Sequence, residues 1–484
     1  MRDHVAVRWL FLRVLGLVFL AAFGAIWVQV DGLFGAHGIV PVSERIRNAH
    51  ESLGPAGWQQ VLTVFWWDAS DAALHRALAG GSLLSLLLIL GVAPIPVLAS
   101  LLVLYHSLFV VGSPFLNFQW DTLLLETGFL AIFYAPWALV PRPSREAGPA
   151  RASVFLMRYM LFRLMFASGA VKLTSGDVNW ANLTAMDFHY MTQPLPPWTA
   201  WYWHHLPPFA HKLESLATFI VELAVPFLAF GHRQARGAAF GAYALLLAML
   251  LVTGNYGFFN YLTFALAVTI LDDTMLPARL RGWIAGPGQP GRRGEWPGFL
   301  VWPIAALCFV ISTMHFAGGI ELGPARWPRL LVQLDDVVAP AHVFHEYGLF
   351  RTMTVDRPEV VIEGSNDGVA WKAYELPYKM GDPSRAPRFV APHMPRLDWQ
   401  LWFAALARVG RQDWFVSLLQ CILQGSKPVL ALFAVNPFPD APPKYVRAQL
   451  YDYRFSTAEE RRATGAWWVR TLTGPFFPAA SLRE

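Results

Sequence analysis

Long runs of apolar residues, separated by short polar loops, fill the chain up to about residue 317. The runs lie near residues 9–30, 72–91, 94–111, 119–140, 153–173, 214–231, 237–253, 258–274 and 298–316. An α-helix needs about 17–25 apolar residues to cross the hydrocarbon core of a bilayer, and these runs have that length. The pattern predicts about nine transmembrane helices within residues 1–317.

Arginines are concentrated in three of the loops, 141–152, 232–236 and 277–297, the last of which contains Arg292 and Arg293. With the N-terminus inside, an even number of runs precedes each basic loop, so all three lie inside. An excess of Lys and Arg marks cytoplasmic loops. The count therefore predicts an inside N-terminus, an uncleaved first run that anchors the chain, and an outside location for everything after residue 317.

The character of the sequence changes after residue 317. Alternating β-branched and polar residues predict strands at 359–364, 369–376 and 444–455. The intervening Ser365–Gly368 has the Asx and Gly residues of a hairpin turn. One or two helices are also expected here, one of them beginning near Asp398. Residues 318–484 are therefore predicted to form a β-rich extracytoplasmic domain.

Composition agrees with a membrane protein. Charged residues make up only 15% of the chain, against roughly 25% in soluble proteins. The net charge of +5 is explained by basic loops, so we expect no nucleic-acid partner. Two cysteines, Cys308 and Cys421, exclude a disulfide framework. His204, His205 and His211 lack the spacing of a zinc site, so no metal and no cofactor is predicted.

Several ionisable residues fall inside the apolar runs, where they are costly and usually face the bundle interior. At a rise of about 1.5 Å per residue, Glu126, Arg163 and Glu222 lie about 10–15 Å below the outer edge of the bilayer. Asp121 and Lys172 lie within about 3 Å of that edge. We therefore expect Arg163 to pair with Glu126 or Glu222, and Lys172 to pair with Asp121.

This polar cluster has two interpretations. In the first, the ion pairs only fix the register of the helices, as structural pairs often do. In the second, Glu126, Arg163, Lys172 and Glu222 are catalytic residues in an outward-facing intramembrane cavity.

Sequence blocks in order along the chain carry a family resemblance: Phe118–Leu130, Phe162–Leu173, Asp187–Pro196, Tyr347–Arg351, Glu363–Gly368 with Trp371, Pro395–Gln400 and Pro442–Arg447. Through these blocks the chain resembles the lipase maturation factor family. The resemblance implies a multi-pass protein that helps secreted lipases reach an active, assembled state. In animal members this takes place in the endoplasmic reticulum membrane, with the C-terminal domain in the lumen.

The Ala-, Arg- and Pro-rich composition is typical of a bacterial chain, for which the inner membrane and the periplasm are the equivalent compartments. We take as candidate binding residues those that stand within or beside the resembling blocks: Asp121, Trp180, Asp187, His189, Tyr190, Trp371 and Asp398.

Two weaker resemblances are local. Phe166, Gly169, Lys172, Leu173 and Trp180 resemble a pattern in the transmembrane domain of vitamin-K-dependent carboxylases, which implies base chemistry for Lys172. The alternative is a lysine that snorkels at the outer rim. The Gly364–Gly368 turn followed by Trp371 resembles a hairpin of discoidin-like β-sandwiches, so the C-terminal domain is expected to be sandwich-like.

Together these observations predict an α-helical polytopic membrane protein with a C-terminal β-rich extracytoplasmic domain. The first functional hypothesis is a non-enzymatic maturation factor, whose partners are membrane lipid and a secreted, lipase-like client protein. The second is a membrane enzyme with carboxylase-like, quinone or lipid chemistry in the intramembrane cavity.

Overall fold

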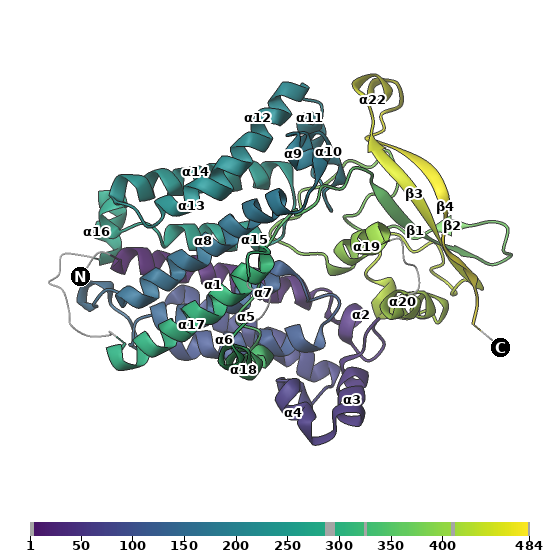
Figure 1. Cartoon of the computed structure of the whole chain (residues 1–484). Helices are drawn as coiled ribbons and strands as arrows, with labels where there is room; N and C mark the ends of the chain where they lie inside the picture. Colours follow the sequence, from purple (N-terminus) through teal and green to yellow (C-terminus); the bar gives the residue numbers. More distant parts are fainter. Residues whose placement is uncertain (1–3, 286–295, 324–326, 408–411, 483–484) are drawn as a thin grey trace.

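The computed structural model describes residues 4–285, 296–323, 327–407 and 412–482. A long bundle of helices forms one end of the molecule, and a small antiparallel sheet forms the other (Figure 1). The N-terminus lies at the end of the bundle far from the sheet, and the C-terminus lies beside the sheet.

In the described part of the chain, six helices are long and apolar enough to cross a membrane. They are α1 (Val5–Trp27), α5 (Asp71–Leu90), α6 (Pro94–Val111), α8 (Arg151–Thr174), α14 (Arg233–Thr253) and α17 (Gly298–Gly319). Each coincides with one of the predicted spans, which confirms a multi-pass helical membrane protein.

The other three predicted spans coincide with shorter helices. Span 119–140 corresponds to α7 (Gln119–Tyr134), which stops where Ala135 precedes Pro136 and becomes extended. Span 214–231 corresponds to α12 (Pro208–Phe219), the π-helical turn η4 (Ile220–Ala224) and α13 (Val225–Leu228). Span 258–274 contains α15 (Phe259–Val268) and the start of the 3₁₀ turn η5 (Asp273–Met275).

The remaining helices are short and lie in the loops and in the C-terminal part. They are α2 (Val30–Phe34), α3 (Val42–Leu53), α4 (Gly57–Gln60), α9 (Val178–Ala181), α10 (Ala185–Thr192), α11 (Trp198–His204), α16 (Ala278–Ala285), α18 (Arg329–Val338), α19 (Arg396–Ala407), α20 (Asp413–Leu423), α21 (Lys427–Leu430) and α22 (Ala458–Thr464).

The start of α14 and helix α16 lie at the end of the bundle that holds the N-terminus (Figure 1). Arg8 of α1 donates to Glu146 in loop 141–152 at 2.8 Å. Arg233, which opens α14, donates to the carbonyl of Thr274 at 2.7 Å. These contacts bring the loops to one side, as the charge pattern predicts. Arg292 and Arg293 lie outside the described residues.

The C-terminal sheet has the strand order β2-β1-β3-β4 and is antiparallel throughout. Its strands are β1 (Pro358–Ser365), β2 (Lys372–Ala373), β3 (Tyr445–Phe455) and β4 (Trp468–Ala480). The predicted hairpin is present, but β2 is much shorter than the predicted strand 369–376, because Asp367 caps the backbone N–H groups of Val369 and Ala370 in the turn.

The domain was expected to be sandwich-like, but its described residues form this single antiparallel sheet. The apolar face of β1 and β3 packs against α19 and α20, so helices take the place of a second sheet. The same apolar core continues from the sheet into the bundle without a break, from Val446 and Leu397 through Tyr347 to Phe19. The sheet therefore has a fixed position relative to the helices.

Candidate functional site

Arg163 and Glu126 form a fully buried ion pair between α8 and α7, as the depth argument predicts. Arg163 also donates to the carbonyl of His345, at 3.4 Å. The hydroxyl of Tyr347 donates to the second carboxylate oxygen of Glu126, at 2.7 Å. The pair therefore holds the segment around residues 345–347 inside the bundle.

Lys172 pairs with Glu222 and not with Asp121, which corrects the second predicted pair. Its Nζ lies 2.7 Å from Glu222 Oε2, and it also donates to the carbonyls of Ser168 and Leu349, both at 3.0 Å. Glu222 is presented by η4, and π-helical turns are frequent at functional sites. Because three acceptors use the three N–H bonds of the ammonium, no proton of Lys172 is left for another partner.

Asp121 instead binds Arg396 of α19 in a bidentate pair, at 2.7 and 2.8 Å, and both side chains are 0% exposed. The hydroxyl of Tyr105 donates to the same carboxylate at 2.6 Å. The predicted pairs included only charges within the apolar runs, and Arg396 lies outside these runs. The partner of Asp121 reaches the bundle from a helix 275 residues further along the chain.

The three buried pairs share a property that the sequence did not indicate. Glu126 binds Tyr347, Lys172 binds the carbonyl of Leu349, and Asp121 binds Arg396. Each of these three pairs therefore fastens the C-terminal part of the chain to the helices of the bundle.

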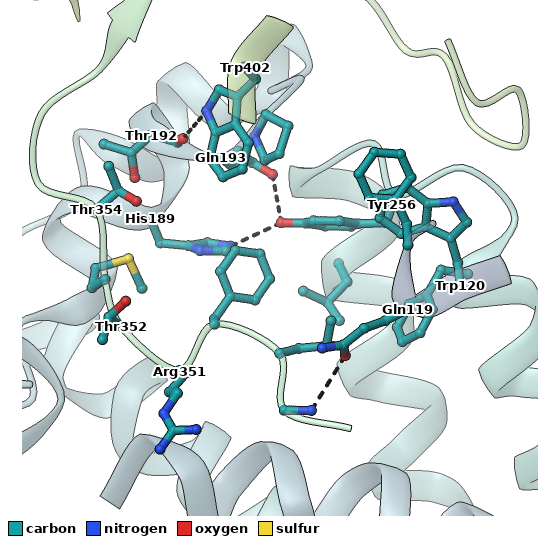
Figure 2. Close-up of a pocket in the computed structure, with 18 of the residues that line it drawn as sticks. Gln119, Trp120, His189, Thr192, Gln193, Tyr256, Arg351, Thr352, Thr354 and Trp402 are labelled. Carbon is teal, nitrogen blue, oxygen red and sulfur yellow. Dashed lines mark hydrogen bonds between the residues drawn. The ribbon is translucent and has the colours of Figure 1, made fainter. Parts of the chain in front are cut away.

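A cavity of about 690 Å³ lies at this junction (Figure 2). Its walls come from the start of α7, the end of α8, α10, α14, α15, the segment 348–354 and α19. Aromatic side chains form much of the lining: Phe118, Trp120, Trp180, Tyr256, Phe259, Phe350, Trp399, Trp402 and Phe403. This size and apolar character are typical of a small-molecule site, which usually measures about 300–1,000 Å³.

Four of the predicted site residues line this cavity, namely Lys172, Trp180, His189 and Glu222. The Trp180 indole donates to the carbonyl of Phe350 at 3.0 Å and lies beside the Lys172 ammonium. Glu126 and Arg163 lie deeper, beside a space too small for a water molecule. The predicted cluster is therefore divided between the cavity and the packed interior.

The other candidate binding residues lie outside the cavity lining. Asp187 pairs with His211 at 2.7 Å, and Tyr190 donates to Glu214 at 3.0 Å, so both fasten α10 to α12. Trp371 lies on the hairpin beneath the guanidinium of Arg447, 4.1 Å from the ring centroid. Asp398 accepts the backbone N–H groups of Tyr378 and Lys379 at 3.0 and 2.7 Å. Burial raises the pKa of Asp398 to about 6.

His189 is a buried, titratable residue in the wall of the cavity. The hydroxyl of Tyr256 connects His189 to Gln193: it lies 2.8 Å from Gln193 Oε1 and 3.3 Å from His189 Nε2 (Figure 2). Burial, assisted by the charge of Lys172, lowers the pKa of His189 to about 4. The neutral ring is therefore the form that the fold accommodates.

Acidification is expected to destabilise the fold through His189. In the unfolded chain the imidazole of His189 has a pKa near 6.5 and becomes protonated below that pH. In the folded protein the same imidazole stays neutral down to about pH 4. The free energy of unfolding is therefore unaffected by His189 above pH 6.5. It decreases as the pH falls towards 4, by up to about 3 kcal/mol. Melting temperatures of purified protein at pH 7.5 and 5.0 should show a smaller difference in His189→Gln than in the wild type. Equal differences in the two proteins would contradict this assignment.

Two groups of residues at the junction were not found as site residues from the sequence. Arg396 and Tyr347 belong to blocks that carry the family resemblance, but they lie outside the apolar runs in which charges were sought. Tyr256 stands just before the eighth run and Asn260 lies within it, both as ordinary polar residues, and only the packing of α15 against α14 reveals that they reach the cavity wall.

Comparison with known proteins covers both parts of the chain. Residues 6–278 match the lipase maturation factor transmembrane domain, and residues 343–478 match the lipase maturation factor C-terminal domain. Lipase maturation factor 2 of Homo sapiens is 37% identical, over 99% of this chain and 83% of the human protein. Lipase maturation factor 1 of Mus musculus is 32% identical, over 100% of this chain and 89% of the mouse protein. No solved structure matches the chain.

The matches to both domains, and the full-length similarity to proteins from several vertebrates, agree with the blocks identified in the sequence. The chain belongs to the lipase maturation factor family.

Proposed function

We propose that this protein assists the maturation of exported, lipase-like proteins, and that its C-terminal domain holds the client beside the membrane. The observation that carries the proposal is the similarity to lipase maturation factors over both halves of the chain. The fixed attachment of the sheet to the bundle supports it, because a client held by the sheet stays at a constant distance from the helix ends.

We further propose the topology in detail: nine crossings, an inside N-terminus and an outside C-terminal domain, divided at residues 1–317 and 318–484. Support comes from α16 and the start of α14, which lie with the N-terminus at the end of the bundle opposite to the sheet, and from the excess of arginines in these loops. The membrane is the endoplasmic reticulum membrane in a eukaryotic cell and the inner membrane in a bacterium.

In this proposal the intramembrane charges are structural. A lysine that acts as a base needs a free lone pair directed at a substrate, whereas the Lys172 nitrogen donates to Ser168, Glu222 and Leu349 at once. Arg163 and Glu126 lie in tightly packed surroundings without room for a substrate. Their contacts with residues 345–349 support a role in holding the C-terminal domain in place.

Deletion of the gene is expected to lower the specific activity of at least one exported lipase severalfold, with restoration by a wild-type copy. The client can be captured with a photo-crosslinking residue at Val369, which is 83% exposed on the hairpin. The matched control is Trp283, 72% exposed on α16 at the opposite end of the bundle.

Crosslinks to an exported lipase from position 369 and none from position 283 would support both the client and the topology. Unchanged activity of every exported hydrolase in the deletion strain would refute the maturation role. Crosslinks from position 283 alone would reverse the proposed orientation.

A further inference from the structure

We propose that the 690 Å³ cavity is a binding site for a single acyl chain, whose carbonyl or carboxyl head is recognised by unpartnered polar groups in the wall. This inference goes beyond the maturation role and does not rest on it. The chain would come from a free fatty acid or from an acyl ester lipid, which share this head chemistry.

The first observation is a buried amide without a partner. Asn260 of α15 lines the cavity and is only 1% exposed. Within the described residues, neither its Oδ1 nor its Nδ2 has a hydrogen-bond partner. An amide buried without hydrogen bonds costs about 1–3 kcal/mol, so such groups are rare in packed interiors and call for a partner.

The second observation is a pair of indoles in the same condition. Trp120 of α7 and Trp399 of α19 line the same cavity and are buried. Their Nε1–H groups find no acceptor in the part of the chain that the structure describes. By contrast, Trp180 and Trp402 in the same wall donate to the carbonyls of Phe350 and Thr192. The cavity therefore combines donors that have acceptors with donors that have none.

The chemistry of these groups selects the ligand head. An indole N–H can only donate, and the Asn260 amide offers two further N–H bonds and one acceptor. A head group with acceptor oxygens, such as a carboxyl or an ester, matches the N–H donors of these residues, and a protonated carboxyl also offers a donor to Asn260 Oδ1. A hydrocarbon without oxygen would leave them unpartnered, and the ammonium of Lys172 is already bound by three acceptors.

The apolar side chains of the cavity wall favour a hydrocarbon chain as the rest of the ligand. Leu246 and Leu250 of α14, Phe259, Phe403 and Leu406 provide an apolar surface beside the polar groups. Burial of such a surface against methylene groups contributes about 0.8 kcal/mol per CH₂. The cavity also lies at the ends of α8 and α14 that face the sheet, the level at which the acyl esters of a lipid leaflet begin in the proposed topology.

Binding can be measured on the full-length protein in detergent with cis-parinaric acid, a polyene fatty acid that accepts excitation energy from tryptophan. We expect saturable energy transfer. Asn260→Leu, which keeps the size and removes the amide, should weaken binding about three- to tenfold. Leu250→Trp should weaken binding severalfold, because its ring narrows the apolar part of the cavity.

Each variant has a matched control on the same bundle. Tyr243→Phe removes another buried, unpartnered polar group that does not line the cavity, and Leu245→Trp adds a ring to the exposed side of α14. Both should bind the probe as the wild type does. Equal binding in Asn260→Leu and wild type, or equal loss in Leu245→Trp and Leu250→Trp, would overturn the assignment.

Competition between the probe and other lipids tells whether the bound acyl chain belongs to a free fatty acid or to an ester. Displacement of the probe by palmitic acid, by a monoacylglycerol or by both supports an acyl site and tells the free acid from the ester. Displacement by hexadecane as effectively as by palmitic acid would overturn recognition of the head. Should Leu250→Trp not fold, Leu246→Phe fills the same wall with a smaller change in volume.

Discussion

Asp121→Ala is expected to destabilise the protein by about 3–5 kcal/mol, because it leaves the Arg396 guanidinium buried without its counter-charge. The same change removes the acceptor of the Tyr105 hydroxyl. The loss should first appear at the junction, since Arg396 belongs to α19, which packs on the sheet. The melting temperature in detergent, together with limited proteolysis of the C-terminal domain, measures this effect.

The control for Asp121 is an ion pair of the same kind at the surface. Asp68 and Arg76 also form a pair, but both side chains are exposed. Exposed pairs contribute about 0–1 kcal/mol, so Asp68→Ala should leave both the melting temperature and the proteolysis pattern near those of the wild type. Similar losses in Asp121→Ala and Asp68→Ala would show that Asp121 and Arg396 do not hold the junction together.

Glu126→Ala is expected to have an effect of the same size, about 3–5 kcal/mol, because Arg163 then lies uncompensated in the bundle interior. The double variant Glu126→Leu/Arg163→Met removes both charges and keeps the volume. Replacement of a buried pair by apolar residues is often neutral, so most of the lost stability should return. Unfolding curves of the two single variants and the double variant measure this coupling.

The same double variant separates the structural role from a catalytic one. If Glu126 and Arg163 only hold residues 345–347, a folded double variant should restore exported lipase activity in the deletion strain. A double variant that folds with wild-type stability and restores no activity would point instead to chemistry at this pair.

The sequence was sufficient for the elements whose signals are local. Runs of apolar residues located the helices that cross the membrane, and helix rise alone brought Glu126 and Arg163 to one level. The Ser365–Gly368 turn correctly located the hairpin, because Ser365 and Asp367 side chains satisfy the backbone within the turn itself.

The remaining features depend on contacts between distant segments. Strand β4 was missed because Gly474, Pro475 and Pro478 are unfavourable in strands, and its edge position and bulges accommodate them. The partner of Asp121 was missed because Arg396 lies far along the chain. The unpartnered amide of Asn260 has no sequence signal at all, since the same residue would be unremarkable with an acceptor beside it.

The position of Arg396 also constrains the order in which the protein can assemble. A ribosome completes α7, with Asp121, 275 residues before it reaches the only cation that binds this carboxylate within the described residues. Until then the carboxylate lacks the counter-charge that it has in the folded protein. Asp121 therefore gains its counter-charge only after residue 396 has been translated, whereas the Glu126–Arg163 and Lys172–Glu222 pairs can form among the helices alone.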